Sequence, residues 1–177
     1  MNTVYLNGAF LPASEAKISP MDRGYLFGDG IYEVIPSYAG RFVGFTAHID
    51  RMQTGLAQLS IDAALTASQW RTIASRLLDE NRPLLGENIA VYIQISRGAD
   101  SKRGHGFPVG ITPTVFAFAM PIAAAPEADK SKVTSFNVIT APDLRWQRCH
   151  IKSTSLLGNV LHFQQSKAAG ADEVLLF

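Results

Sequence analysis

The sequence of 177 residues has one cysteine, no long apolar run and no excess of charge of either sign. The single cysteine, Cys149, excludes an internal disulfide and any metal site built from several cysteines. With 16 Lys and Arg against 15 Asp and Glu, the net charge of +1 lacks the basic excess typical of nucleic-acid and anionic-membrane binders. No apolar run approaches the roughly 20 residues that span a bilayer. We therefore expect a cytoplasmic enzyme or binding domain without nucleic-acid or membrane partners.

Strand and turn signals dominate the first third of the chain, and hydrophobic residues make up 47% of the whole sequence, enough for a sizeable core. The dipeptides at 7–8 (Asn-Gly) and 39–40 (Ala-Gly) each separate two strand-like runs and predict two β-hairpins. Pro36 lies inside the first strand of the second hairpin, which favours a sheet edge or a bulge there. Residues 22–30, "DRGYLFGDG", are rich in glycine and are expected to be irregular.

Two helices are predicted next. Thr46 is a suitable N-cap for the first, and Thr66 with Gln69 forms a capping-box pattern for the second. The apolar residues of the first helix recur at helical spacing and predict a buried stripe: Ile49, Met52, Leu56 and Leu59. Those of the second predict a similar face: Trp70, Ile73 and Leu77.

The later segments predict an α+β fold with two domains. The runs "NIAVYIQIS" and "TVFAFAM" are strands that complete an N-terminal α/β domain over residues 1–120, and the alanine- and proline-rich residues 121–130 form a linker. Residues 131–177 then begin a second domain with a strand "SKVTSFNVIT", a helix over residues 155–169 and a strand "DEVLLF". Because the sequence stops on an apolar strand-like run, we expect a truncated chain, the front part of a longer protein.

Lys152, in "RWQRCHIKSTSLLGNVL", lies between an extended-looking segment and an apolar helix. One interpretation is a lysine whose stem covers apolar surface while its amine stays in water. The other is a Schiff-base lysine, whose amine attacks a carbonyl only when neutral and therefore needs a lowered pKa. If the segment is extended, Arg148 and His150 share a face with Lys152 and place cations beside its amine, while Cys149 packs on the other face.

Two further basic groups have two interpretations each. Arg51 either pairs in solvent with Asp50 or Asp22, or binds a phosphate through its planar fork of donors. Arg103 and His105 are two residues apart in a long loop, and they form either a solvated basic loop or a pair that binds a carboxylate. No histidine has metal-ligand spacing with carboxylates, so no metal site is expected.

Four segments in this order, "DRGYLFGDGIYEV", "HIDRM", "RGADSKRGHGFP" and "RWQRCHIKSTSLLGNVL", resemble the fold-type IV pyridoxal-phosphate enzymes. This family includes D-amino acid transaminase, branched-chain aminotransferase and aminodeoxychorismate lyase. The resemblance implies a homodimer with pyridoxal 5'-phosphate as cofactor. It implies that Lys152 forms the Schiff base and moves the proton between substrate Cα and cofactor C4′. Arg51 matches the family arginine that binds the cofactor phosphate, and Tyr32 matches a tyrosine near the substrate carboxylate.

The loop motif distinguishes among the family's activities. Arg103 and His105 resemble the Arg-x-His of D-amino acid transaminases, which reaches across a dimer interface and binds the substrate α-carboxylate. The resemblance therefore implies transamination of D-alanine or D-glutamate with a 2-oxo acid. A branched-chain aminotransferase, an aminodeoxychorismate lyase and a non-catalytic fragment that only folds and dimerises remain alternatives. The sequence departs from the pattern at His150, where D-amino acid transaminases often have aspartate. The family's pyridine-binding glutamate, in a segment like "EGSSSN", has no counterpart in the 177 residues.

Overall fold

The computed structural model of the protein describes residues 2–177, which divide into two compact units. Unit 1 is the chain up to Ala125 together with Ile151–Thr154, and unit 2 is Pro126–His150 with Ser155–Phe177. Lys152 therefore belongs to unit 1, while the predicted domain boundaries at residues 121 and 130 stay predictions. None of the helices within residues 2–177 is long and apolar enough to cross a membrane.

Unit 1 contains a six-stranded antiparallel sheet with the order β2-β1-β6-β5-β3-β4. Its strands are β1 Thr3–Leu6, β2 Ala9–Pro12, β3 Gly30–Tyr38, β4 Arg41–Phe42, β5 Asn88–Ser96 and β6 Thr114–Pro121. Both predicted hairpins are confirmed, and all four turn residues have positive φ, as their tight two-residue turns require. Pro36 lies in β3 beside the short edge strand β4, and its carbonyl accepts from the Val43 amide at 2.9 Å. The proline nitrogen thus faces the edge, where a missing donor is tolerated.

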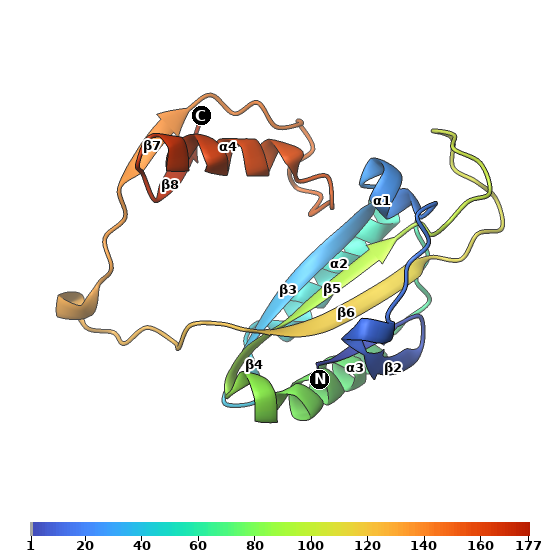
Figure 1. Ribbon diagram of the computed structural model, residues 1–177, viewed down its shortest axis with the longest axis horizontal. Coiled ribbons are helices and arrows are strands. Elements are labelled where there is room, and N and C mark those ends of the chain that lie inside the picture. Colours follow the sequence, from blue (N-terminus) through green and yellow to red (C-terminus); the bar gives the residue numbers. More distant parts are fainter. Residues whose placement is uncertain (1) are drawn as a thin grey trace. The chain divides into compact units, whose positions relative to one another are not determined.

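Helices α2 (Phe45–Gln58) and α3 (Ala67–Leu85) pack on one face of this sheet (Figure 1). The predicted capping box of Thr66 and Gln69 is confirmed. Thr46, however, is not an N-cap: α2 begins one residue earlier, and Gly44 with φ +62° turns the chain from β4 into the helix. The predicted stripes are buried against the sheet and form the core with Ile31, Ile35 and Ile93, except that Leu59 is only partly buried and follows the end of α2.

Alternation along the strands sends a second set of side chains to the face without helices. Tyr32, Tyr92, Phe118 and Phe116, here called the aromatic row, cross strands β3, β5 and β6 with centroid distances of 5.6, 4.9 and 5.6 Å. These four rings are half-buried. The Tyr32–Tyr92 and Tyr92–Phe118 pairs join neighbouring strands and stabilise the sheet, whereas Phe116 and Phe118 both lie on β6.

Residues 22–30 are more regular than predicted, because helix α1 spans Arg23–Phe27. Asp22 caps it by accepting from the Gly24 amide at 2.8 Å, and Gly28 ends it with φ +66°. The aspartate before the run and the glycine after it are helix signals, and their spacing allows only one and a half turns. We missed these signals because the glycines of the segment favour an irregular structure.

Unit 2 contains two parallel strands, β7 (Val138–Ala141) and β8 (Glu173–Leu176), and helix α4 (Leu157–Ala168). Short 3-10 helices span Lys130–Lys132 here and Ala13–Glu15 in unit 1. The strand predicted over residues 131–140 is confirmed only at its end, and α4 begins two residues later than predicted. Gly170, with φ +69°, follows the helix end as expected.

The segment before Lys152 is not extended, which corrects one prediction. Residues 147–150 form turns. The prediction that Arg148 and His150 share an extended face with Lys152 is therefore wrong. Cys149 is exposed rather than packed, and its thiol donates to the Trp146 carbonyl at 2.9 Å. This hydrogen bond closes a local turn, whereas an extended segment would bond to a neighbouring strand.

Candidate active site

Lys152 lies on a short extended segment that pairs with the beginning of β3. The Tyr32 amide donates to the Lys152 carbonyl at 3.0 Å, and the Thr154 amide donates to the Gly30 carbonyl at 3.0 Å. Ile151 and Ser153 are buried on either side of the lysine. Because backbone bonds fix both flanks, the position of the Lys152 side chain is set by β3.

The Lys152 amine lies over the ring of Tyr32, 4.0 Å from its centroid. This is a cation–π distance, and the lysine side chain is half-buried rather than extended into solvent. Two residues further on, the Thr154 hydroxyl donates to the Gly28 carbonyl at 3.0 Å. The structure therefore brings together two of the predicted site residues, Lys152 and Tyr32.

Arg51, on α2, is paired with a carboxylate that the sequence reasoning missed. Its Nε and Nη2 donate to the two oxygens of Glu33, each at 2.6 Å, and His48 Nδ1 lies 2.8 Å from the same carboxylate. The Glu33 side chain is 0% exposed, while that of Arg51 is 50% exposed. The acidic partner of Arg51 is thus Glu33 and not the predicted Asp50 or Asp22.

Charge is retained on Glu33 despite its burial. Burial by itself raises the pKa of this carboxyl, but the hydrogen bonds and charges of Arg51 and His48 outweigh it and hold the pKa below its ordinary value. The hydrogen bonds to Glu33 in turn raise the pKa of Arg51, and Tyr32 adds to the same effect. Tyr32 and Glu33 are neighbours on β3, so one strand carries both the ring that contacts Lys152 and the carboxylate that pairs with Arg51.

Arg103 and His105 are exposed on the loop between β5 and β6, and both contact Phe27 of α1. The guanidinium carbon of Arg103 lies 5.0 Å from the Phe27 ring centroid, and the His105 ring meets Phe27 edge-on at 5.5 Å. Within residues 2–177, these two side chains gather on Phe27 and do not join the Lys152–Tyr32 pair. The predicted site residues therefore form three groups in one chain: Lys152 with Tyr32, Arg51 with Glu33, and Arg103 with His105.

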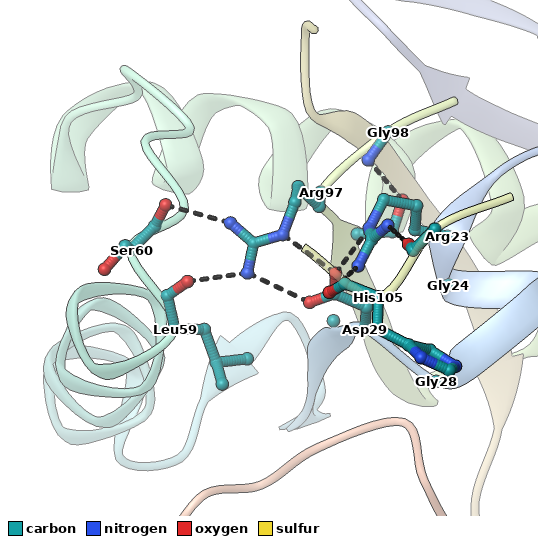
Figure 2. A network of polar contacts seen from close by, with 12 residues as sticks. Arg23, Gly24, Gly28, Asp29, Leu59, Ser60, Arg97, Gly98 and His105 are labelled. Carbon is teal, nitrogen blue, oxygen red and sulfur yellow. Dashed lines mark hydrogen bonds and ion pairs between the residues drawn. The ribbon is translucent and has the colours of Figure 1, made fainter. Parts of the chain in front are cut away.

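A buried network of charges lies beneath this loop (Figure 2). Asp29 accepts from Arg23 Nε at 2.8 Å and from Arg97 Nε and Nη2 at 2.8 and 3.0 Å. Arg97 also donates to the Leu59 and Ser60 carbonyls at the end of α2, at 2.7 and 3.1 Å. Burial raises the pKa of Asp29, but the bonds from both arginines outweigh it and hold the pKa below its ordinary value.

The sequence contained a signal for some of these missed residues. Glu33 lies between Ile31 and Ile35 at an inward-facing position of an alternating strand, where an unpaired charge is costly. Arg97 directly follows the buried strand β5. A charge at such a position predicts a buried partner, although the identity of the partner depends on the fold.

A hollow of about 520 Å³ opens on the helix-free face of the sheet. Its lining includes Tyr25, Gln94, Phe116 and Thr154. Gln94 is the register partner of Tyr32, so the hollow lies beside the tyrosine that contacts Lys152. Lys152 and Tyr32 do not line the hollow themselves, but Thr154, two residues beyond the lysine, does.

Comparison with known proteins gives matches over nearly the whole chain. Residues 30–177 match the amino-transferase class IV family. The chain is 36% identical over 173 residues to a D-alanine aminotransferase of Bacillus licheniformis, covering 98% of this chain and 59% of that protein. It is 37% identical over 176 residues to a D-alanine aminotransferase of Staphylococcus haemolyticus, covering 99% and 60%. The chain therefore spans about 60% of the length of these curated relatives.

Solved structures share the fold at low sequence identity. The Escherichia coli branched-chain amino acid aminotransferase superposes with a TM-score of 0.81 at 16% identity, over 99% of this chain and 59% of that one. A branched-chain aminotransferase of Thermoproteus uzoniensis with norvaline gives 0.76 at 20% identity, over 99% and 59%. A hypothetical aminotransferase from Mycobacterium tuberculosis, in its PLP-bound form, gives 0.76 at 18% identity, over 98% and 61%. At these identities the likeness establishes the fold alone.

Proposed function

The chain belongs to the class IV aminotransferases, and from that premise we propose that it carries the reactive lysine of a pyridoxal-phosphate-dependent transaminase. The observation that carries the proposal is the Lys152 amine held 4.0 Å from the Tyr32 ring, on a segment bonded to β3 at both flanks. A lysine on an aromatic face beside a hollow is placed to react with a bound carbonyl. We propose a cytoplasmic location, which the sequence favours.

The described residues fit pyridoxal 5'-phosphate. When bound, this group supplies an aldehyde that an amine can attack and a ring that withdraws electrons from the bonds at substrate Cα. Arg51 has five N–H donors, and Glu33 accepts from only two of its nitrogens, so further donors remain for a phosphate. Lys152 supplies the amine and Tyr32 an aromatic surface.

Each side chain has a separate task in this proposal. Glu33 holds the Arg51 guanidinium in one orientation, which reduces the entropy that phosphate binding would cost. Tyr32 and the β3 pairing hold the Lys152 amine in one place, from which it would move a proton between substrate Cα and cofactor C4′. The hollow beside Tyr32 accommodates the substrate.

We propose a D-amino acid, such as D-alanine or D-glutamate, and a 2-oxo acid as substrates. The identities of 36% and 37% to two D-alanine aminotransferases support this choice. Arg103 and His105 would bind the substrate α-carboxylate. Because they gather on Phe27 apart from the Lys152–Tyr32 pair, we propose that a second copy of the chain brings its loop to this site, in a homodimer.

The test uses the purified chain incubated with pyridoxal phosphate. We expect a yellow complex that borohydride converts to a stable adduct on Lys152, identified by peptide mass. Lys152→Ala should abolish the adduct, whereas Lys17→Ala, at an exposed lysine of the same unit, should not. An adduct that persists in Lys152→Ala refutes the assignment.

The substrate is tested with two amino donors and one lyase substrate. Pyruvate formed from D-alanine with 2-oxoglutarate supports the proposal. Transfer from L-leucine, or pyruvate released from aminodeoxychorismate, would instead assign a branched-chain aminotransferase or a lyase. A chain that fixes no cofactor and catalyses none of these reactions would be a non-catalytic fragment.

A further inference from the structure

The loop that carries Arg103 and His105 has no regular structure of its own over most of its length. It comprises residues 97–113, between β5 and β6, and is here called the 97–113 loop. Most of its residues near Arg103 are exposed. A loop of this kind needs support from elsewhere if its side chains are to bind a ligand with little loss of entropy.

Arg23 of α1 supplies such support to the middle of the loop. Its Nη1 donates to the Gly104 carbonyl at 2.6 Å and its Nη2 to the His105 carbonyl at 3.2 Å. These carbonyls belong to the Arg-x-His motif itself. The Arg23 side chain is only 4% exposed, so these charge-assisted bonds are shielded from water.

Arg23 is itself held in place by the network of Figure 2. Its Nε donates to Asp29 Oδ2 at 2.8 Å, and Arg97 donates to both oxygens of that carboxylate. The loop is therefore fixed at its first residue by Arg97 and at its middle by Arg23, both through Asp29. Because Arg97 also bonds the carbonyls that end α2, the anchor is continuous with the packed core.

Phe27, one turn beyond Arg23 on α1, supports the side chains of the same motif. The Arg23 guanidinium carbon lies 4.9 Å from its ring centroid, on a ring that Arg103 and His105 also contact. One helix thus holds the backbone of the motif through a buried cation and its side chains through a ring.

We propose that Arg23 is a positioning residue that anchors the 97–113 loop and so orders Arg103 and His105 for binding a substrate carboxylate. The carboxylate part rests on the proposed function; the anchoring does not. Arginine is required because its planar fork reaches three acceptors in different directions: Asp29, Gly104 and His105. A lysine has its donors on one nitrogen and cannot span them.

The anchoring is tested by tryptic cleavage after Lys102 and Arg103 in the folded, cofactor-treated chain, followed by mass spectrometry. We expect Arg23→Gln to raise the cleavage rate at least about tenfold, since loss of charged hydrogen bonds frees the loop locally. Arg23→Lys, which keeps the charge and the fold, should give an intermediate rate. Arg76→Gln, which removes an exposed arginine of α3, is the matched control and should cleave like the unmodified chain.

Kinetics with D-alanine test the consequence for binding. Arg23→Lys should raise KM about tenfold with little change in kcat, as expected when binding geometry and not chemistry is impaired. Phe27→Leu leaves the Arg23 bonds intact and should raise KM while cleavage stays near the rate of the unmodified chain. Unchanged cleavage in both Arg23 variants would overturn the anchoring, and a fall in kcat at constant KM would overturn the positioning role. If the unmodified chain lacks transaminase activity, the proposed function fails, and the cleavage rates still decide whether Arg23 anchors the loop.

Discussion

The two units differ in where their apolar side chains lie. In unit 1 the strands and helices enclose a core that includes Ile93, Leu77 and Trp70. In unit 2, large apolar side chains of α4 such as Leu161 and Val160 are exposed, and His162 and Ser166 are among its buried residues. The two tryptophans report this contrast, because Trp70 in unit 1 is 1% exposed and Trp146 in unit 2 is 45% exposed.

Unit 1 has exposed ion pairs such as Arg76–Glu80, but it also has two paired carboxylates with little exposure. The carboxylates of Glu33 and Asp29 in unit 1 are 0% and 12% exposed, and each has two basic partners. In unit 2, the Asp143 and Glu127 side chains, which pair with Arg145 and Lys132, are 32% and 69% exposed. A core therefore orients charged side chains as well as stabilising the fold, because water competes for the hydrogen bonds of exposed ion pairs. The candidate site residues all lie in unit 1.

The largest effect is expected from truncation in the core. Ile93→Ala in unit 1 should lower the free energy of unfolding by about 2–5 kcal/mol, because it leaves a cavity at a fully buried position. Leu161→Ala in unit 2 should change it by less than about 0.5 kcal/mol, because that side chain is exposed. Urea unfolding followed by tryptophan fluorescence in Trp70-only and Trp146-only variants measures both. Equal losses would remove the distinction between the units.

Breaking a buried pair should have the next largest effect. Glu33→Gln should cost about 2 kcal/mol, since it removes hydrogen bonds from a charged partner to a buried acceptor. The half-exposed Arg51 can then be hydrated, which limits the loss. Asp143→Asn is the matched control in unit 2: the pKa of Asp143 is held at about 2 by Arg145, but solvent screens the pair and the unfolding transition should not move.

Acid should lower the stability of unit 1 because it protonates the carboxylates of Glu33 and Asp29. The ordinary pKa values are 4.5 for Glu33 and 3.8 for Asp29, and both are lowered in the folded chain. Their ionised forms therefore stabilise the fold fully above those values, and the stabilisation is lost as the pH falls below them toward the lowered pKa values. The Trp70 transition, measured between pH 6 and pH 3, should show this slope. Glu33→Gln should flatten it, and an unchanged slope would contradict the role of Glu33.

The smallest effect concerns Tyr92 of the aromatic row. Burial, with a contribution from Tyr32, raises the pKa of Tyr92 to about 12. All five tyrosines lie in unit 1, so ultraviolet titration of phenolate reports on that unit alone. Tyr92→Phe should remove the component that ionises at about pH 12 and leave stability nearly unchanged.

Local patterns predicted much of unit 1. Two-residue turns, alternation and the Thr66 capping box depend on neighbours in sequence, and the structure confirms them, as it confirms the α+β fold-type IV architecture. The prediction of Thr46 as the N-cap was wrong because Gly44, with its positive φ, occupies the N-cap position. The helix therefore begins without a side-chain capping bond. The turn before Lys152 was missed because residues 147–150 contain no glycine or proline that would have indicated it.

The candidate site was predicted by resemblance and only partly by residue pattern. Lys152, Arg51, Tyr32, Arg103 and His105 were all named, and their roles stay predictions. Their supports were not named, because each joins segments far apart in sequence. Arg97 lies 68 residues from Asp29, and Arg23 lies 81 residues from Gly104. Such pairs follow from the strand order of the sheet, which local patterns do not specify.

One oxygen of Asp29 serves two arginines, and this sharing has an energetic consequence. Arg23 and Arg97 both donate to Oδ2, so the trio has two cations for one anion. Replacing either arginine removes its repulsion of the other. The free-energy changes of the two single replacements therefore do not add up to the joint contribution of Arg23 and Arg97. The contribution of each arginine to the free energy of unfolding cannot be separated from that of the other. A double-mutant cycle, with both single replacements and the double one, measures their coupling energy.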